Sequence, residues 1–245
     1  MPRGVPPVDG LSAAVIIPAA GIGRRFRESL PHRRSRRERR KPFLTLRGRP
    51  LLAWSLLACE ATPIVSEVVL AVHRDDRARA LALVKRYRCR KVRAVVPGGA
   101  TRAESVYRGL QAVSAHIPIV AVHDAARPLV TPALVTRVVR AAAHTGAALA
   151  AAPMVPTTKL VDRRGRVMAT LDRRRLWAAQ TPQAFRRDVL EAAYRRTRGR
   201  AWRQVTDESA LVEQCGVRSC VVEDTPRNVK ITTRDDLRVA EALLR

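Results

Sequence analysis

A stretch near the start of the chain combines small residues with positive charge, a pattern suited to phosphate binding. It reads Pro-Ala-Ala-Gly-Ile-Gly-Arg-Arg over residues 18–25 and follows the apolar run Val15–Ile17. Small residues let the backbone approach a ligand closely, and bare N–H groups in such a bend form a concavity for anions. Arginine adds a forked partner for phosphate. We therefore predict a buried strand that ends in a phosphate-binding loop.

Two familiar phosphate motifs do not match this loop. A P-loop would end in Gly-Lys-Ser/Thr, which is absent. The dinucleotide fingerprint needs a third glycine where Phe26 stands, and an acidic residue about 20 positions later. Glu38, inside a basic run, is the only candidate for that acidic residue. An ordinary strand-to-helix turn also fits Gly-x-Gly, so the pattern alone leaves the type of site open.

Other residues have the chemistry that phosphoryl transfer requires. Such reactions need cations that meet the charge on the reacting phosphorus, and usually a metal ion held by a carboxylate. The candidate cations are Arg25, Lys41 and Lys230, and the candidate metal ligand is Asp124, just after the predicted strand Ile119–Val122. Solvated surface charges, and a turn role for Asp124, are the alternative interpretations.

The first 153 residues alternate regularly between strand and helix patterns. Strands are predicted over 15–17, 67–72, 91–96, 119–122 and 147–152, and helices over 51–61, 75–87 (capped by Asp75), 101–114 and from Thr131 onward. This order favours an α/β fold, a parallel sheet with helices on both faces. Ligands bind beyond the carboxyl ends of such strands, so loops 18–26, 97–102 and 123–127 are expected to converge.

The alternation breaks after residue 153. Residues 159–161 and 167–169 flank Asp162–Arg166 and predict a β-hairpin. An isolated hairpin is marginal in water, so we expect it to pack on another surface such as a second subunit. Further strands are predicted over 176–180, 217–223 and 229–232, and helices over 187–198, 206–215 and after Thr233.

Composition limits the class of protein. The 245 residues suit a single domain, residues 1–245, and no apolar run is long enough for a membrane span. The four cysteines form no Cys-x-x-Cys pair, and the N-terminus lacks a secretion-signal layout, so a cytoplasmic protein is expected. The net charge of +26 suggests nucleic acid, but the arginines are spread along the chain and aromatic residues are scarce.

Six motifs together resemble one enzyme family, the 2-C-methyl-D-erythritol 4-phosphate cytidylyltransferases of non-mevalonate isoprenoid synthesis. They occur in the family's order over nearly the whole chain, and His-Asp-Ala-Ala-Arg-Pro is the most specific. The motifs are Pro-Ala-Ala-Gly-x-Gly-Arg-Arg (18–25), Gly-Gly-x-x-Arg-x-x-Ser (98–105), His-Asp-Ala-Ala-Arg-Pro (123–128), Gln-Thr-Pro-Gln (180–183), Thr-Asp-Glu (206–208) and Asn-Val-Lys-Ile-Thr (228–232).

The resemblance implies a Rossmann-like, mostly parallel sheet of the nucleotide-diphospho-sugar transferase type, which moves CMP from CTP to methylerythritol phosphate with Mg²⁺. Arg25, Lys41 and Lys230 would then meet the α-phosphate, and Asp124 would hold the metal. The residues expected to contact CTP are Pro18, Ala19, Ala20, Gly21, Gly23, Gly98, Gly99, Arg102, Ser105, Ala125 and Arg127. Thr157 and Arg173 would bind the acceptor from a hairpin arm, residues 154–175, of the neighbouring subunit in a homodimer.

The chain departs from the family pattern at a few positions. A basic insertion at residues 31–40, expected to be flexible, precedes Lys41, so a neighbouring arginine is an alternative α-phosphate contact. Thr158 competes with Thr157, and Arg173 is one of three consecutive arginines. Two other functions stay open: a cytidylyltransferase for an alditol phosphate such as ribitol 5-phosphate, and a nucleic-acid-binding protein that uses the insertion.

Overall fold

The computed structural model describes residues 10–21, 26, 40–197 and 201–244. Predictions about Gly23, Arg25 and residues 31–39 of the insertion lie outside this part of the chain.

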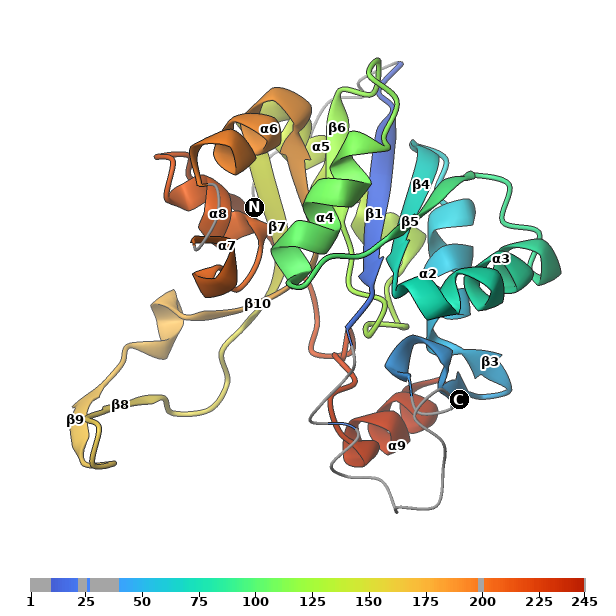
Figure 1. Ribbon diagram of the computed structural model, residues 1–245. Helices are drawn as coiled ribbons and strands as arrows, with labels where there is room; N and C mark the ends of the chain where they lie inside the picture. Colours follow the sequence, from blue (N-terminus) through green and yellow to red (C-terminus); the bar gives the residue numbers. More distant parts are fainter. Residues whose placement is uncertain (1–9, 22–25, 27–39, 198–200, 245) are drawn as a thin grey trace.

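A mostly parallel sheet forms the centre of the molecule (Figure 1). Within the described residues it has seven strands in the order β11-β7-β10-β6-β1-β4-β5. Their bounds are β1 Ala13–Ala19, β4 Val65–Val72, β5 Val92–Pro97, β6 Ile119–Val122, β7 Ala147–Pro153, β10 Trp177–Arg186 and β11 Cys220–Glu223. Only β10 runs antiparallel to its neighbours β6 and β7. The predicted α/β class is confirmed.

Helices cover both faces of this sheet, as expected for a parallel sheet buried on each side. One face carries α2 (Leu51–Glu60), α3 (Arg77–Arg86) and α5 (Pro132–Thr145). The opposite face carries α4 (Arg102–Gln111), α6 (Arg187–Arg196), α7 (Ala201–Gln204) and α8 (Glu208–Glu213). The closing helix α9 (Arg234–Leu243) packs below the sheet with Leu46 and Ile231.

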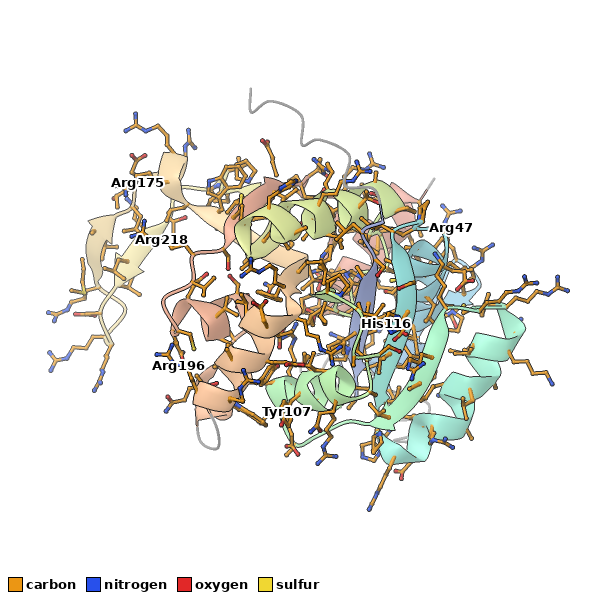
Figure 2. All side chains as sticks on the ribbon, turned by 90° about the horizontal axis from the view of Figure 1, so that it is seen from above. Arg47, Tyr107, His116, Arg175, Arg196 and Arg218 are labelled. Atoms are coloured by element: carbon orange, nitrogen blue, oxygen red, sulfur yellow. The ribbon has the colours of Figure 1, made fainter. Side chains whose placement is uncertain are left out.

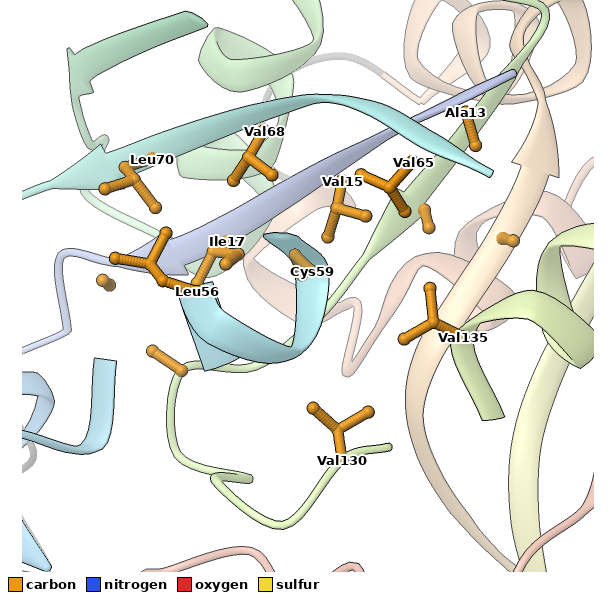
Figure 3. Close-up of a cluster of buried hydrophobic side chains, with 14 of the residues drawn as sticks. Ala13, Val15, Ile17, Leu56, Cys59, Val65, Val68, Leu70, Val130 and Val135 are labelled. Atoms are coloured by element: carbon orange, nitrogen blue, oxygen red, sulfur yellow. The ribbon is translucent and has the colours of Figure 1, made fainter. Parts of the chain in front are cut away.

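The side chains of β1 divide between the two cores. Val15 and Ile17 point into the cluster beneath α2, where Figure 3 shows them beside Leu56 and Leu70. Ile16 points to the other face. This alternation is the two-residue period of a strand, and burial of both sets explains why the whole run is apolar. Each fully buried aliphatic side chain of this size contributes about 1.5–3 kcal/mol, so β1 is a firm base for the loop that follows it.

Several predicted boundaries were wrong for identifiable reasons. Pro18 does not end β1. A proline has no N–H to donate to a neighbouring strand, but β6 pairs with β1 only as far as Ile16, so no hydrogen bond of the sheet is lost at Pro18. Asp75 does not cap α3, because a 3-10 turn, η2 (Arg74–Asp76), precedes the helix. Residues 229–232 do not form a strand, although the Ile231 N–H donates to the Ala126 carbonyl at 2.8 Å.

The predicted hairpin is present and projects from the body of the molecule (Figure 1). It consists of β8 (Lys159–Val161) and β9 (Val167–Thr170), followed by the 3-10 turn η3 (Arg173–Arg175). Its apolar side chains are unusually exposed: Val167 and Met168 are 62% and 66% accessible.

The described residues contain no helix that is long and apolar enough to cross a membrane. The positive charge is widely spread: in Figure 2, Arg47 and Arg175 lie at opposite sides of the molecule.

Candidate active site

A cavity of about 620 Å³ opens at the carboxyl edge of the sheet, where the loops after β1, β5 and β6 meet. The short turn η1 (Lys41–Phe43) and Lys230 complete its wall. The lining residues are Pro18, Ala19, Ala20, Gly21, Lys41, Pro42, His73, Gly99, Ala100, Thr101, Arg102, Ser105, Asp124, Ala125, Ala126 and Lys230.

The loops after β1 and β5 press directly against each other. A Cβ placed on Gly98 would lie 2.2 Å from the Ala20 Cβ, closer than any real contact. The Gly98 N–H donates to the Val72 carbonyl at 2.7 Å, which fixes this loop to the end of β4. Glycine at position 98 is therefore required by a close approach of two backbones.

Side chains at the start of α4 hold the β5 loop in shape. Thr101 caps the helix by accepting from the Glu104 N–H at 3.0 Å. Glu104 reaches back to the Ala100 N–H at 2.8 Å, and Ser105 Oγ accepts from the Gly99 N–H at 3.0 Å. These bonds satisfy backbone donors that would otherwise lack partners at a helix start. Ser105 thus orders the loop in addition to lining the cavity.

Asp124 is the one carboxylate among the described residues that line the cavity. Arg102 Nε lies 3.0 Å from Asp124 Oδ1, and Lys230 Nζ lies 2.6 Å from Oδ2. Burial alone would raise the pKa of this carboxyl, but the charges of Arg102 and Lys230 outweigh it and hold the pKa well below its usual range. Asp124 is therefore an ionised carboxylate held between two cations.

These residues fit a divalent cation of a particular kind. Among the described residues, no group of three or more His, Cys, Asp or Glu side chains could hold a metal ion by itself. Mg²⁺, however, commonly binds through one or two carboxylates together with substrate phosphates and water. A single ionised carboxylate in a cavity of this size matches that donor set, so Asp124 would hold a cation that arrives with a phosphorylated ligand.

Two lysines bring positive charge to the cavity from distant parts of the chain. Lys41 Nζ donates to the Ile231 carbonyl at 2.7 Å, which places it beside Lys230 in the fold. Arg40 lies just before Lys41 and pairs with Asp75 and Asp76, each at 3.2 Å. Lys41 rather than Arg40 therefore lines the cavity.

A buried network supports the Asp124 loop from behind. Thr181 Oγ1 accepts from the Asp124 N–H at 3.0 Å and lies 3.1 Å from His123 Nδ1. His123 Nε2 lies 3.2 Å from the Arg127 carbonyl, which can only accept, so Nε2 carries the proton and Nδ1 accepts from Thr181. Burial lowers the pKa of His123 to about 4, so this imidazole is neutral near pH 7.

The predicted site residues fall into four groups. Most line the cavity, whereas Gly98 lies against Ala20 and Arg127 lies behind the wall, where its Nη1 donates to the Asn228 carbonyl at 2.6 Å. Thr157 and Arg173 are exposed on the arm and do not line the cavity of their own chain. Gly23 and Arg25 lie outside the described residues.

Several residues of the site escaped the sequence analysis. Pro42 and His73 line the cavity without having been predicted, and Ala100, Thr101 and Ala126 lie in the predicted loops 97–102 and 123–127 but were not named as site residues. Thr101 had a usable signal, because it begins the capping pattern next to the glycine loop. His73 follows β4 directly, at the same edge as the other loops, but a lone histidine in a basic loop gives no chemical signal.

Comparisons with known proteins agree with this geometry. The sequence matches the family described as "IspD: 2-C-methyl-D-erythritol 4-phosphate cytidylyltransferase" over residues 13–245. The chain is 42% identical to the 2-C-methyl-D-erythritol 4-phosphate cytidylyltransferase of Pelotomaculum thermopropionicum, with 95% of this chain and 94% of that protein covered. It is 43% identical to the enzyme of that name from Symbiobacterium thermophilum, with 94% and 92% covered.

Solved structures give the same result. The crystal structure of 4-diphosphocytidyl-2C-methyl-D-erythritol synthase from Anaerococcus prevotii superposes with a TM-score of 0.80 at 28% identity, covering 96% of this chain and 99% of that one. The 2-C-methyl-D-erythritol 4-phosphate cytidylyltransferase from Thermus thermophilus has a TM-score of 0.74 at 32% identity, with 95% and 98% covered. The chain therefore belongs to the 2-C-methyl-D-erythritol 4-phosphate cytidylyltransferase family.

Proposed function

We propose that this chain transfers CMP from CTP to 2-C-methyl-D-erythritol 4-phosphate, releasing pyrophosphate and forming 4-diphosphocytidyl-2-C-methyl-D-erythritol. Family membership over residues 13–245 supports this activity. The observation that carries it is the meeting of three loops, two lysines and one ionised aspartate around a single cavity. The reaction serves isoprenoid precursor synthesis by the non-mevalonate route, and we expect it to take place in the cytoplasm.

The proposed chemistry joins two anions, so charge neutralisation and positioning supply most of the catalysis. A phosphate oxygen of the acceptor attacks the α-phosphorus of CTP in line, the bond to the bridging oxygen breaks, and pyrophosphate leaves. Lys41 and Lys230 lie where they would meet charge at the α-phosphate, and Arg25 joins them by resemblance to the family. The narrow loop of Ala19, Ala20 and Gly21 would admit the triphosphate close to the backbone.

Asp124 would hold the divalent cation, and that cation would supply further neutralisation of the triphosphate charge. Lys230 Nζ pairs with Asp124 Oδ2 in the structure, and the Lys230 side chain is 42% exposed. An ammonium group on a flexible stem can turn from the carboxylate to a phosphate within the same cavity. By resemblance to the family, the cytosine ring would lie against the Gly98–Ser105 loop, which lines the cavity at Gly99 and Ser105.

The hairpin arm, residues 154–175, would complete the acceptor site of a second copy in a homodimer. Its apolar side chains are exposed in the single chain. Monomeric soluble proteins rarely expose large contiguous apolar patches, so a second copy is expected to cover these side chains. Arg173 Nη1 donates to the Val155 carbonyl at 2.9 Å, so the two ends of the arm are tied together. Thr157 and Arg173 would then bind methylerythritol phosphate in the partner's cavity.

Pyrophosphate release tests this function directly. The purified chain is incubated with CTP, Mg²⁺ and either 2-C-methyl-D-erythritol 4-phosphate or ribitol 5-phosphate, with ATP, GTP and UTP as nucleotide controls. We expect turnover only with CTP and the methylerythritol acceptor. Preference for ribitol 5-phosphate would favour the alditol enzyme instead.

A second measurement addresses nucleic acid. Deletion of residues 32–39 should leave CTP turnover intact if the basic run is accessory to catalysis. Salt-sensitive RNA or DNA binding that disappears with the deletion, without CTP turnover in the full chain, would support the nucleic-acid alternative.

A further inference from the structure

Glu208 is a fully buried carboxylate whose role the proposed reaction does not yet explain. It stands in the first turn of α8, more than 80 residues from Asp124, and does not line the cavity. The residue is 0% exposed, and its Oε2 lies 2.5 Å from Arg102 Nη1. Its Oε1 lies 3.2 Å from the Tyr194 hydroxyl. Burial raises the pKa of this carboxyl, and the adjoining Arg102 guanidinium opposes the rise, so Glu208 is the ion-pair partner of Arg102.

Arg102 is divided between two carboxylates. Its Nε lies 3.0 Å from Asp124 Oδ1, while its Nη1 lies 2.5 Å from Glu208 Oε2. A guanidinium group is planar and rigid, so two anchors on different edges fix its plane as well as its position. The guanidinium carries one positive charge. The Glu208 carboxylate neutralises part of it, so Asp124 faces less positive charge from Arg102 than it would alone.

Three successive ion pairs join Glu208, Arg102, Asp124 and Lys230 in a row of alternating charge. The row contains two negative and two positive groups, so its net charge is zero. Two cations contact Asp124. Within the described contacts, Arg102 also pairs with a second carboxylate, Glu208, whereas Lys230 pairs with Asp124 alone. Loss of the Glu208 charge would leave Asp124 facing two cations with no other carboxylate in the row. A divalent cation would then meet a more positive site.

We propose that Glu208 is a positioning residue that holds Arg102 against the cavity wall and shares its charge, so that Asp124 remains available to a divalent cation. This inference rests on the proposed function only in assigning the cation to Asp124. A simpler role for Glu208 is a structural link between α8 and α4. The link would run through the Tyr194 hydroxyl, which lies 3.1 Å from the Ala103 carbonyl. Under that role, substitution of Glu208 would not change the affinity for the cation.

The test is a titration of Mn²⁺–CTP with the protein, because Asp124 would hold a cation that arrives with a phosphorylated ligand, and it is followed by the change in the electron paramagnetic resonance spectrum of Mn²⁺ when the protein binds. Glu208→Gln removes the charge, keeps one oxygen to accept from Arg102, and can turn its amide N–H toward the Tyr194 hydroxyl oxygen. Asp207→Asn is the matched control: it removes the same charge one residue away, keeps an acceptor for the helix cap, and does not touch Arg102. Tyr194→Phe removes the hydroxyl contact without changing any charge.

We expect Glu208→Gln to weaken Mn²⁺ binding about tenfold, because the site then carries one more net positive charge, which repels the divalent cation. Asp207→Asn and Tyr194→Phe should stay within about twofold of the wild type. A Glu208→Gln affinity within that range would overturn the proposal, and so would an equal loss in either control. The thermal unfolding midpoint of each variant is measured in parallel, and a fall in the midpoint alone counts against the proposal.

A second variant keeps the test decisive if Glu208→Gln does not fold. The double variant Arg102→Gln/Glu208→Gln removes one charge of each sign and leaves Asp124 facing only Lys230 in the row. It should bind Mn²⁺ at least as tightly as the wild type, and weaker binding would overturn the proposal. Wild-type turnover with CTP and methylerythritol phosphate is assayed separately, so failure of the proposed function is distinguished from failure of this inference.

Discussion

Replacement of Gly98 by alanine would put a methyl group inside the contact between the loops after β1 and β5. An ideal Cβ at this position lies 2.2 Å from the Ala20 Cβ and 3.0 Å from Ser105 Oγ. Carbon atoms in ordinary contact rest about 3.5–4.0 Å apart, so the two loops must separate by roughly 1.3–1.8 Å. Ala20 has no longer side chain that could rotate away, and the backbone itself has to move.

Both loops line the cavity, so this movement should affect catalysis more than stability. Overpacking of this kind costs about 1–3 kcal/mol of folding free energy. A misplacement of about 1 Å in a catalytic site lowers the rate on the order of 10²-fold. We therefore expect Gly98→Ala to fold with a modestly lower unfolding midpoint and to lose about 10²-fold in kcat/KM, measured by pyrophosphate release.

A compensating substitution isolates the cause. Ala20→Gly removes the methyl group that the new Cβ would meet, which leaves Ser105 Oγ at 3.0 Å and the Val72 carbonyl at 3.5 Å as its nearest neighbours. The double variant Ala20→Gly/Gly98→Ala should recover most of the lost kcat/KM. Wild-type behaviour of Gly98→Ala, or a double variant no better than the single one, would refute the close-approach argument.

Three further substitutions probe other parts of the molecule. Lys41→Ala should lower kcat on the order of 10²–10³-fold, the usual effect of removing one preorganised charge donor, and unchanged turnover would reject that role. Asp236→Ala should cost about 1 kcal/mol in urea unfolding, because Asp236 completes the capping box of α9. Burial opposes ionisation of Asp236, but hydrogen bonds from Thr232 and Thr233 lower its pKa, so this stabilisation is present at neutral pH and should be lost as the pH falls through the folded-state pKa. Met168→Glu on the exposed arm should shift a dimer toward monomers in sedimentation velocity without changing the unfolding of the body, and an unchanged dimer would count against the proposed role of the arm.

The sheet and its edge could be predicted because both depend on local patterns. Continuous apolar runs identify β1, β4 and β6 as strands buried on both faces. Parallel strands end at the same edge, so the loops that follow them must meet wherever they lie in the sequence. The antiparallel course of β10 could not be predicted in this way, since strand direction depends on which neighbours it pairs with.

The supports of the site could not be predicted for a related reason. Glu208 belongs to the Thr-Asp-Glu motif (206–208), but it acts through Arg102, a contact across 106 positions of sequence that the motif does not reveal. Thr181 likewise gains its role only because β10 runs beside β6 and brings its hydroxyl to the Asp124 N–H. Long-range side-chain contacts of this kind follow from the assembled fold.

The position of Lys41 shows how the fold accommodates the basic insertion before it. Phe43 is buried in the core beneath α2, Arg40 pairs with the buried Asp76, and Lys41 donates to the Ile231 carbonyl. Burial of a phenylalanine side chain alone contributes about 1.5–3 kcal/mol. Each doubling of the length of a flexible loop costs only about 0.6 kcal/mol. The contacts that hold Lys41 beside the cavity therefore contribute more than a doubling of the length of the preceding segment would cost.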